Sequence, residues 1–133
     1  MGLVIDTSVF IRAERDGHRD PVSLLPEGEE VGFCSITLSE LLEGIHYATR
    51  AEIAQSRRAF VTRAQESIPL FSFDAVIAEI HARLRYRQRS IGKMTGAHDL
   101  IIAATAISLG WDVLTFNAAE FGQIDGLGVK TPY

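Results

Sequence analysis

Four acidic side chains stand where an α/β sheet would bring them together. Asp6 ends the apolar run at residues 3–5, and a charge there is costly unless it is solvated, paired or bound to a metal. Glu40 follows a second apolar run, Asp99 begins an alanine-rich segment, and Glu120 follows a third apolar run. Carboxylates that lie close together repel one another, and a divalent cation removes that repulsion. The pattern therefore predicts a cation site.

The donor types indicate which ion this site would hold and what chemistry it would support. Oxygen ligands without His or Cys select Mg²⁺, or Mn²⁺, rather than zinc. Such an ion lowers the pKa of a bound water and stabilises charge on phosphate, so hydrolysis of a phosphodiester is the expected reaction. Asp6, Glu40 and Asp99 are the predicted metal ligands, and Glu120 is a fourth catalytic candidate. Asn117 offers an amide oxygen nearby, and whether Asn117 or Glu120 fills the fourth position is left open, as is the choice between one ion and two.

Purely structural roles are the alternative for several of these residues. Thr37 and Glu40 have the spacing of a capping box, in which a hydroxyl and a Glu three residues later cap a helix. Asp99 also stands near a predicted helix N-terminus, where acids are favoured. Polar neighbours are predicted to support the carboxylates through hydrogen bonds, with ordinary capping as the alternative: Thr7, Ser8, Thr115 and Asn117.

Strands and helices alternate along the predicted chain. Short apolar runs predict strands at residues 3–5, 31–34, 68–71, 111–116 and from 129. Helical spacing and capping residues predict helices after residue 7 and over about 37–48, 50–66, 74–89 and 99–109, the last of them stopped by Gly110. This alternation indicates an α/β domain with a mainly parallel sheet. Ligands of such sheets bind beyond the carboxyl ends of the strands, which is where Asp6 stands.

Four stretches of the chain resemble the motifs of one family. They are Leu3-Val4-Ile5-Asp6-Thr7-Ser8-Val9, the segment from Ser35 to Gly44, Ile91-Gly92 followed by residues 99–106, and the segment from Leu114 to Phe121. Together, and in this order, they are similar to those of PIN-domain ribonucleases, and most closely of VapC-type toxins from toxin–antitoxin pairs. Each motif is weak alone, but four in order over nearly the whole chain are specific.

The resemblance implies a fold, an activity and partners. It implies a five-stranded parallel sheet flanked by helices in a single domain over residues 1–133. It implies magnesium-dependent cleavage of RNA, a cognate antitoxin, a homodimer and a toxin–antitoxin hetero-oligomer, and it carries metal-site roles onto Asp6, Glu40 and Asp99. The rival hypothesis is a catalytically weak or inactive module that binds only an antitoxin or RNA. A phosphatase of the haloacid dehalogenase type is disfavoured, because it needs an Asp where Ser8 stands.

Composition indicates the class of protein and the cellular compartment. The 133 residues are 47% hydrophobic and 23% charged, as in an ordinary globular domain. No apolar run is long enough to span a membrane or to serve as a signal peptide, so a cytoplasmic protein without a membrane partner is expected. The single Cys34 fits a reducing compartment and is interpreted as a buried strand residue.

Positive charge is concentrated in the middle of the chain, although the net charge is −4. Residues 50–93 hold nine Lys or Arg against four Asp or Glu. Four of these cations form a predicted RNA-binding rim: Arg85, Arg87, Arg89 and Lys93. Arginines four residues apart on a helix repel one another, which favours a role in gripping phosphate, while solubility and complementarity to the helix C-terminus are the alternative.

Overall fold

A computed structural model describes residues 1–132 and shows one five-stranded sheet. The strands are β1 (Gly2–Ile5), β2 (Glu30–Cys34), β3 (Leu70–Phe71), β4 (Asp112–Leu114) and β5 (Val129–Lys130). They lie in the order β3-β2-β1-β4-β5, and every pairing is parallel. The predicted fold class, a five-stranded parallel sheet flanked by helices, is confirmed.

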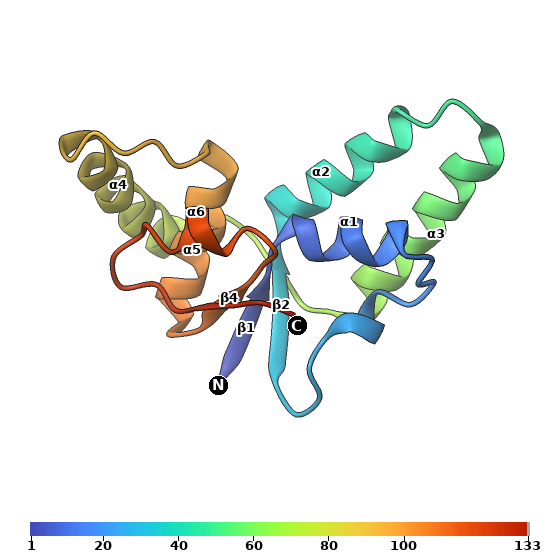
Figure 1. Cartoon of the computed structure of the whole chain (residues 1–133), viewed down its shortest axis with the longest axis horizontal. Coiled ribbons are helices and arrows are strands. Elements are labelled where there is room, and N and C mark those ends of the chain that lie inside the picture. The colour runs from blue at the N-terminus through green and yellow to red at the C-terminus, as the bar shows by residue number, and fades with distance from the viewer. Residues whose placement is uncertain (133) are drawn as a thin grey trace.

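Helices connect the strands and cover both faces of the sheet (Figure 1). They are α1 (Thr7–Arg15), α2 (Ser35–His46), α3 (Ala51–Ser67), α4 (Ala75–Ser90), α5 (Ala97–Leu109) and α6 (Ala118–Phe121), with a short 3₁₀ helix at Pro21–Leu24. In Figure 1, α1, α2 and α3 lie to the right of the strands and α4, α5 and α6 to the left. Gly110 ends α5 with a positive φ of 68°, as the sequence predicted.

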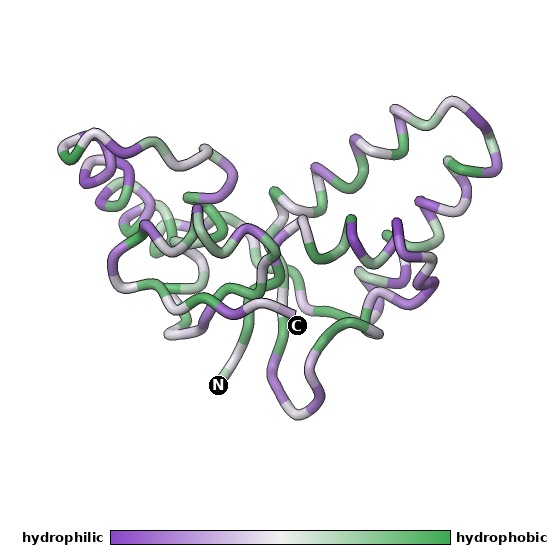
Figure 2. Tube along the Cα trace, viewed as in Figure 1, coloured by the Kyte–Doolittle hydropathy of each residue, from purple (hydrophilic) through white to green (hydrophobic). Residues whose placement is uncertain are grey.

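Two apolar clusters form the core, one on each face of the sheet. Leu3 and Ile5 of β1 pack with residues of α1, α2 and α3, including Phe10 and Phe60. Val4 points to the other face and packs with α5, as the alternation of a strand requires. Hydrophobic residues accordingly run along the middle of β1 and β2 in Figure 2, and hydrophilic stretches recur on the outer helices. This two-sided burial fixes the position of the carboxyl end of β1.

One local expectation from the sequence is wrong. Thr37 does not cap a helix, because α2 begins directly after β2, at Ser35, with Cys34 as its N-cap residue. Thr37 is therefore inside the first turn, and Glu40 lies in the second. The capping-box interpretation of Glu40 is removed, since its carboxylate and the Thr37 hydroxyl are both engaged with α1.

Three smaller expectations concern Cys34, the extent of the domain and membrane-spanning helices. Cys34 is buried at the end of β2, as expected, and burial raises the pKa of its thiol to about 11, so the thiol stays protonated. Tyr133, the last residue of the predicted domain, lies outside the described residues, and the single-domain organisation remains a prediction. Across residues 1–132, no helix has the length and apolar character needed to cross a bilayer.

Candidate active site

The candidate site lies where the order of the strands reverses. From β1 the chain builds the sheet in one direction through β2 and β3, and later in the other through β4 and β5. Crevices at such switch points, beyond the carboxyl ends of the strands, are the usual ligand sites of parallel sheets. Asp6 follows β1, and its N–H donates to the carbonyl of Leu114 at the end of β4 over 2.9 Å. The polar residues after these two strands are therefore neighbours.

Asp6 is buried, and two hydroxyl groups hold its carboxylate. Ser8 Oγ and Thr115 Oγ1 each donate to Oδ2 over 2.7 Å. The same Thr115 oxygen accepts the N–H of Asn117 over 2.8 Å, and Ser8 Oγ accepts the N–H of Phe116 over 3.1 Å. Both donors reach Oδ2, and within the described residues Oδ1 receives no hydrogen bond. The carboxylate is thus held by one oxygen, and the other is left for a ligand.

Glu40 is held by a chain of hydroxyls between α1 and α2. Thr7 Oγ1 lies 3.0 Å from the hydroxyl of the fully buried Thr37 and donates to Glu40 Oε1 over 2.9 Å. The single hydroxyl proton of Thr7 can be donated either to Thr37 Oγ1 or to the Glu40 carboxylate. On its other oxygen, Glu40 lies 3.6 Å from Nδ1 of His98, the residue before Asp99. Glu40 therefore faces the first turn of α5.

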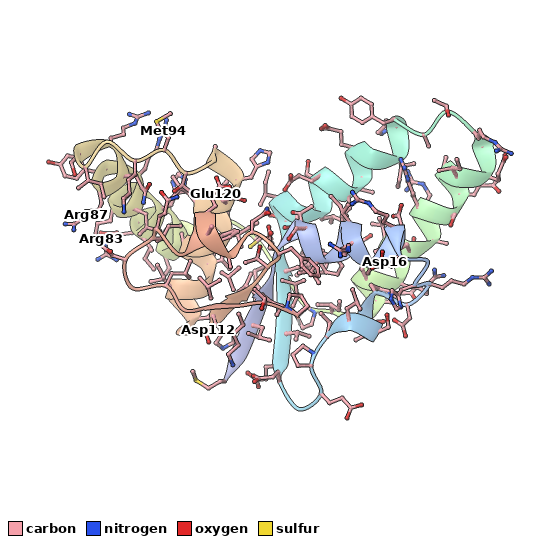
Figure 3. The ribbon with its side chains drawn as sticks, viewed as in Figure 1. Asp16, Arg83, Arg87, Met94, Asp112 and Glu120 are labelled. Atoms are coloured by element: carbon pink, nitrogen blue, oxygen red, sulfur yellow. The ribbon has the colours of Figure 1, made fainter. Side chains whose placement is uncertain are left out.

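Asp99 shows that the four carboxylates form one electrostatic group. Its pKa is raised from 3.8 to about 6, first by burial and then by the negative charges of Asp6, Glu120 and Glu40. A hydrogen bond with Glu120 raises it further. Glu120 also accepts the N–H of Gly96 over 3.3 Å, which ties α6 to the start of α5 (Figure 3). Four separate segments thus bring their acids together, and we call Asp6, Glu40, Asp99 and Glu120 the carboxylate cluster.

The carboxylate cluster fits a divalent cation in charge and in donor type. Over residues 1–132, no Lys or Arg forms an ion pair with any of its members. The repulsion that raises the pKa of Asp99 is therefore not offset by the chain's own cations. Hard oxygen donors are those that Mg²⁺ and Mn²⁺ prefer. In the same part of the chain, no three His, Cys, Asp or Glu side chains converge into a preformed ligand shell.

The structure places most of the predicted supporting residues around the carboxylate cluster. Thr7, Ser8 and Thr115 each bond a carboxylate. Asn117 contributes its backbone N–H, and its side chain makes no hydrogen bond within residues 1–132. Sequence reasoning missed Thr37, whose signal was a threonine three residues after the end of a strand, hidden by the capping-box pattern.

The predicted RNA-binding rim divides into two faces of α4. Arg85, Arg89 and Lys93 line one cavity beside the start of α5. Arg87 instead projects to the outer side of the helix, next to Arg83 in Figure 3, and pairs with Asp125 over 3.1 Å. Arg87 therefore lies on a different face of α4 from Arg85 and Arg89, and RNA binding by the four cations of the rim remains a prediction.

The sequence matches a known family over most of its length. The PIN domain family model matches residues 3–127. Ribonuclease VapC1 of Rickettsia felis is 34% identical, over 98% of this chain and 96% of that protein. Ribonuclease VapC5 of Mycobacterium tuberculosis is also 34% identical, over 92% of this chain and 87% of that protein.

Solved structures give the same fold. A member of the VapBC family of toxin–antitoxin systems, VapBC-5 from Mycobacterium tuberculosis, superposes with a TM-score of 0.76 and 30% identity over 98% of this chain and 96% of that one. VapBC2 from Rickettsia felis, solved bound to a DNA fragment from its promoter, gives a TM-score of 0.80 and 26% identity over 98% of both chains. These likenesses cover the whole sheet and the helices that carry the carboxylate cluster.

Proposed function

Because the chain belongs to the PIN domain family, we propose that it is a metal-dependent ribonuclease, the toxin of a toxin–antitoxin pair. The observation that carries this proposal is the carboxylate cluster at the switch point of the sheet, with Asp99 held at a pKa of about 6. Several acids kept close together without a cationic side chain destabilise a protein unless a ligand uses them. The family favours hydrolysis of RNA phosphodiester bonds, and the oxygen donors of the carboxylate cluster suit a divalent ion that supports this reaction.

The proposed cofactor is a divalent cation, and the donor set favours Mg²⁺, with Mn²⁺ as a substitute. Asp6, Glu40 and Asp99 would hold it, with Glu120 as the fourth acid. When bound, such an ion activates water for attack on phosphorus and stabilises the charge that develops on the phosphate. Asp99, with its raised pKa, changes protonation near pH 6 in the ion-free protein, so ion binding releases a proton at mildly acidic pH.

The remaining residues of the site hold the carboxylates in place. Ser8 and Thr115 hold Oδ2 of Asp6 at the end of a buried strand. Thr7 holds Oε1 of Glu40 and is itself aligned by Thr37. Supporting hydrogen bonds of this kind orient ligands and raise metal affinity. The chain's own contribution to the reaction is thus to orient the carboxylates of Asp6 and Glu40 before substrate arrives.

Partners and setting follow from the same assignment. The chain is the toxin partner of a cognate antitoxin, as in the VapBC complexes to which it is similar. We further propose one PIN-like domain over the whole chain, a homodimer, and a cytoplasmic location. Light scattering of the purified protein alone and with its antitoxin measures both assemblies.

The Asp6→Asn substitution tests the proposed function directly. It keeps the side-chain shape and an oxygen for the Ser8 and Thr115 hydroxyls, but it removes the charge. The rate of RNA cleavage with Mg²⁺ should fall about 100-fold or more, since a ligand and its charge are both lost. Asp16→Asn is the matched control, because Asp16 is exposed at the far end of α1 and, among residues 1–132, forms an ion pair only with Arg12 (Figure 3).

The assay compares RNA cleavage with Mg²⁺, with Mn²⁺ and with a chelator. Wild type and the Asp16 variant should cut RNA only with an added divalent ion. Thermal melting checks that both variants are folded. Full cleavage by Asp6→Asn, or by wild type in chelator, would contradict the proposed site. A folded wild type that binds antitoxin or RNA and cuts none would favour the binding-only module instead.

A further inference from the structure

Beside the carboxylate cluster lies a second site of opposite charge. The last turns of α4, the loop that follows it and the start of α5 enclose a cavity of about 280 Å³. Three cationic side chains line it: Arg85, Arg89 and Lys93. Thr95 adds a hydroxyl and Gly96 adds backbone. We call this cavity the basic pocket.

The basic pocket adjoins the carboxylate cluster. Gly96 and Ala97 line the basic pocket and also line a second hollow, whose other walls are His98 and Asp99. A Cβ built on Gly96 would lie 3.6 Å from Asp99 Oδ2 and 3.8 Å from Glu120 Oε1. One short stretch of backbone therefore separates the three cations of the basic pocket from Asp99 and Glu120.

The basic pocket is fixed by a buried side chain. Gln88 on α4 is only 5% exposed, and its Oε1 accepts the hydroxyl of Thr95 over 2.9 Å. Its backbone carbonyl accepts the N–H of Lys93 over 2.9 Å. Gly92 has a positive φ of 71°, which turns the chain back toward α4. Lys93 is thus held close to the end of α4, where Arg89 lies.

The charges of the basic pocket have no carboxylate partner in the part of the chain that the structure describes. Within residues 1–132, no ion pair joins Arg85, Arg89 or Lys93 to a carboxylate, whereas Arg87 on the outer side of α4 has Asp125. Arg85 and Arg89 are four residues apart on one helix face, where like charges repel and slightly destabilise a helix. This repulsion is small in solvent, and a bound anion would remove it.

We propose that the basic pocket binds consecutive backbone phosphates of the RNA strand, next to the phosphate that is cleaved. This inference rests on the proposed ribonuclease function, because it assigns a subsite of the same substrate. A phosphodiester that approaches four carboxylates meets their repulsion, and one divalent ion offsets only part of that charge. Three cations at the adjoining cavity supply the missing attraction and hold the strand across the site.

Two triple variants with the same change of charge test the inference. The pocket variant is Arg85→Gln, Arg89→Gln and Lys93→Gln. The control variant is Arg58→Gln, Arg83→Gln and Arg87→Gln, at exposed positions of α3 and of the outer side of α4. Gln is a good helix former, so both should fold, and thermal melting checks this. Binding of a fluorescein-labelled single-stranded RNA of mixed sequence is measured in EDTA over a series of KCl concentrations.

The expected result is a smaller salt dependence for the pocket variant alone. Each phosphate neutralised on a single strand contributes about 0.7 to the slope of log affinity against log salt, so losing three contacts lowers the slope by about 2. Between about 50 and 200 mM KCl, wild type should then lose about 15-fold more affinity than the pocket variant loses. The control variant should keep a slope within about 0.7 of wild type.

Several outcomes would overturn the inference. The first is failure of wild type to bind the RNA, and the second is an equal slope of log affinity against log salt for the two variants. The third is a pocket variant that keeps RNA binding but no longer binds antitoxin, because the pocket would then bind a protein partner. Cleavage with Mg²⁺ is measured in parallel. If wild type cuts RNA and the two variants behave alike, only the inference fails. If wild type binds with the expected slope and cuts nothing, only the proposed function fails.

Discussion

Replacing Asp99 by Asn should make the ion-free protein more stable, although it removes a residue of the site. Asp99 is half-buried beside Asp6, Glu40 and Glu120, and its charged form is disfavoured there, as its pKa of about 6 shows. Asn has nearly the same shape and no charge. Its amide can donate to Glu120, which replaces the hydrogen bond that Asp99 forms when it is protonated.

The size of the effect follows from the pKa. Raising the pKa of Asp99 from 3.8 to about 6 corresponds to about 3 kcal/mol, since one pKa unit equals about 1.4 kcal/mol. Asp99 is only half-buried, and solvent screening reduces this value by about half. The carboxylate also gains about 0.5 kcal/mol from the N-terminus of α5, which Asn loses. The net gain for Asp99→Asn is about 1 kcal/mol, or about 3–4 °C in Tm for a domain of this size.

The pH dependence of this gain has a definite direction. The carboxyl of Asp99 has a higher pKa in the folded chain than in the unfolded one, so the folded state binds the proton more tightly. The cost of the charge is full above about pH 6, falls as the pH drops, and is absent below about pH 4. Urea unfolding of both proteins in EDTA at pH values across this range measures the difference.

Added divalent ion should reverse the order of stability. Mg²⁺ binds the folded carboxylate cluster and stabilises wild type by mass action, and it stabilises Asp99→Asn less because one ligand charge is gone. A variant that is less stable than wild type at pH 7 in EDTA would refute the reasoning. So would a stability difference that does not change between pH 4 and pH 7, because the repulsion would then not be its cause.

Three further substitutions test how the other members of the site work. Thr115→Val removes a hydroxyl that donates to Asp6, so the Mg²⁺ concentration for half-maximal cleavage should rise about 10- to 100-fold. Excess Mg²⁺ should restore the rate. An unchanged Mg²⁺ titration would exclude this role of Thr115. Glu120→Gln should lower the rate of RNA cleavage about tenfold or more. Asn117→Ala should leave the rate close to that of wild type, because Glu120 raises the pKa of Asp99 whereas Asn117 carries no charge. The reverse order in a cleavage assay would make Asn117 the fourth position.

Much of the fold could be predicted because the local patterns are strong. The apolar runs that predicted β1 and β2 are buried strands, and Gly110 ends α5 where its position suggested. The start of α2 was missed by two residues. Thr37 and Glu40 matched a capping motif, but β2 leads directly into the helix, and packing of α1 against α2 uses both side chains instead. A local pattern gives no information on a contact between residues thirty positions apart.

The site could be predicted as a set of acids but not as a geometry. The sheet rule placed Asp6 and the residues after β4 at one edge, because parallel strands end together. The choice between Asn117 and Glu120 remains a prediction, and spacing alone could not make it because it depends on the turn after β4, where α6 places Glu120 near Gly96 and Asp99. Spacing along α4 also did not separate Arg87 from its neighbours, because its partner Asp125 is far away in sequence.

The two kinds of charge in this molecule are held in different ways, and the difference has a physical reason. Asp6 is buried and extends a central strand, so hydroxyl donors must satisfy it before any ligand binds. Asp99 lies at the rim and carries the repulsion of the other acids. The basic pocket has cations that solvent screens, so they cost little while it is empty. A divalent ion and the RNA strand would therefore bind cooperatively. The ion reduces the negative charge that repels the phosphates, and the phosphates reduce the positive charge that repels the ion. The two sites adjoin at Gly96–Ala97.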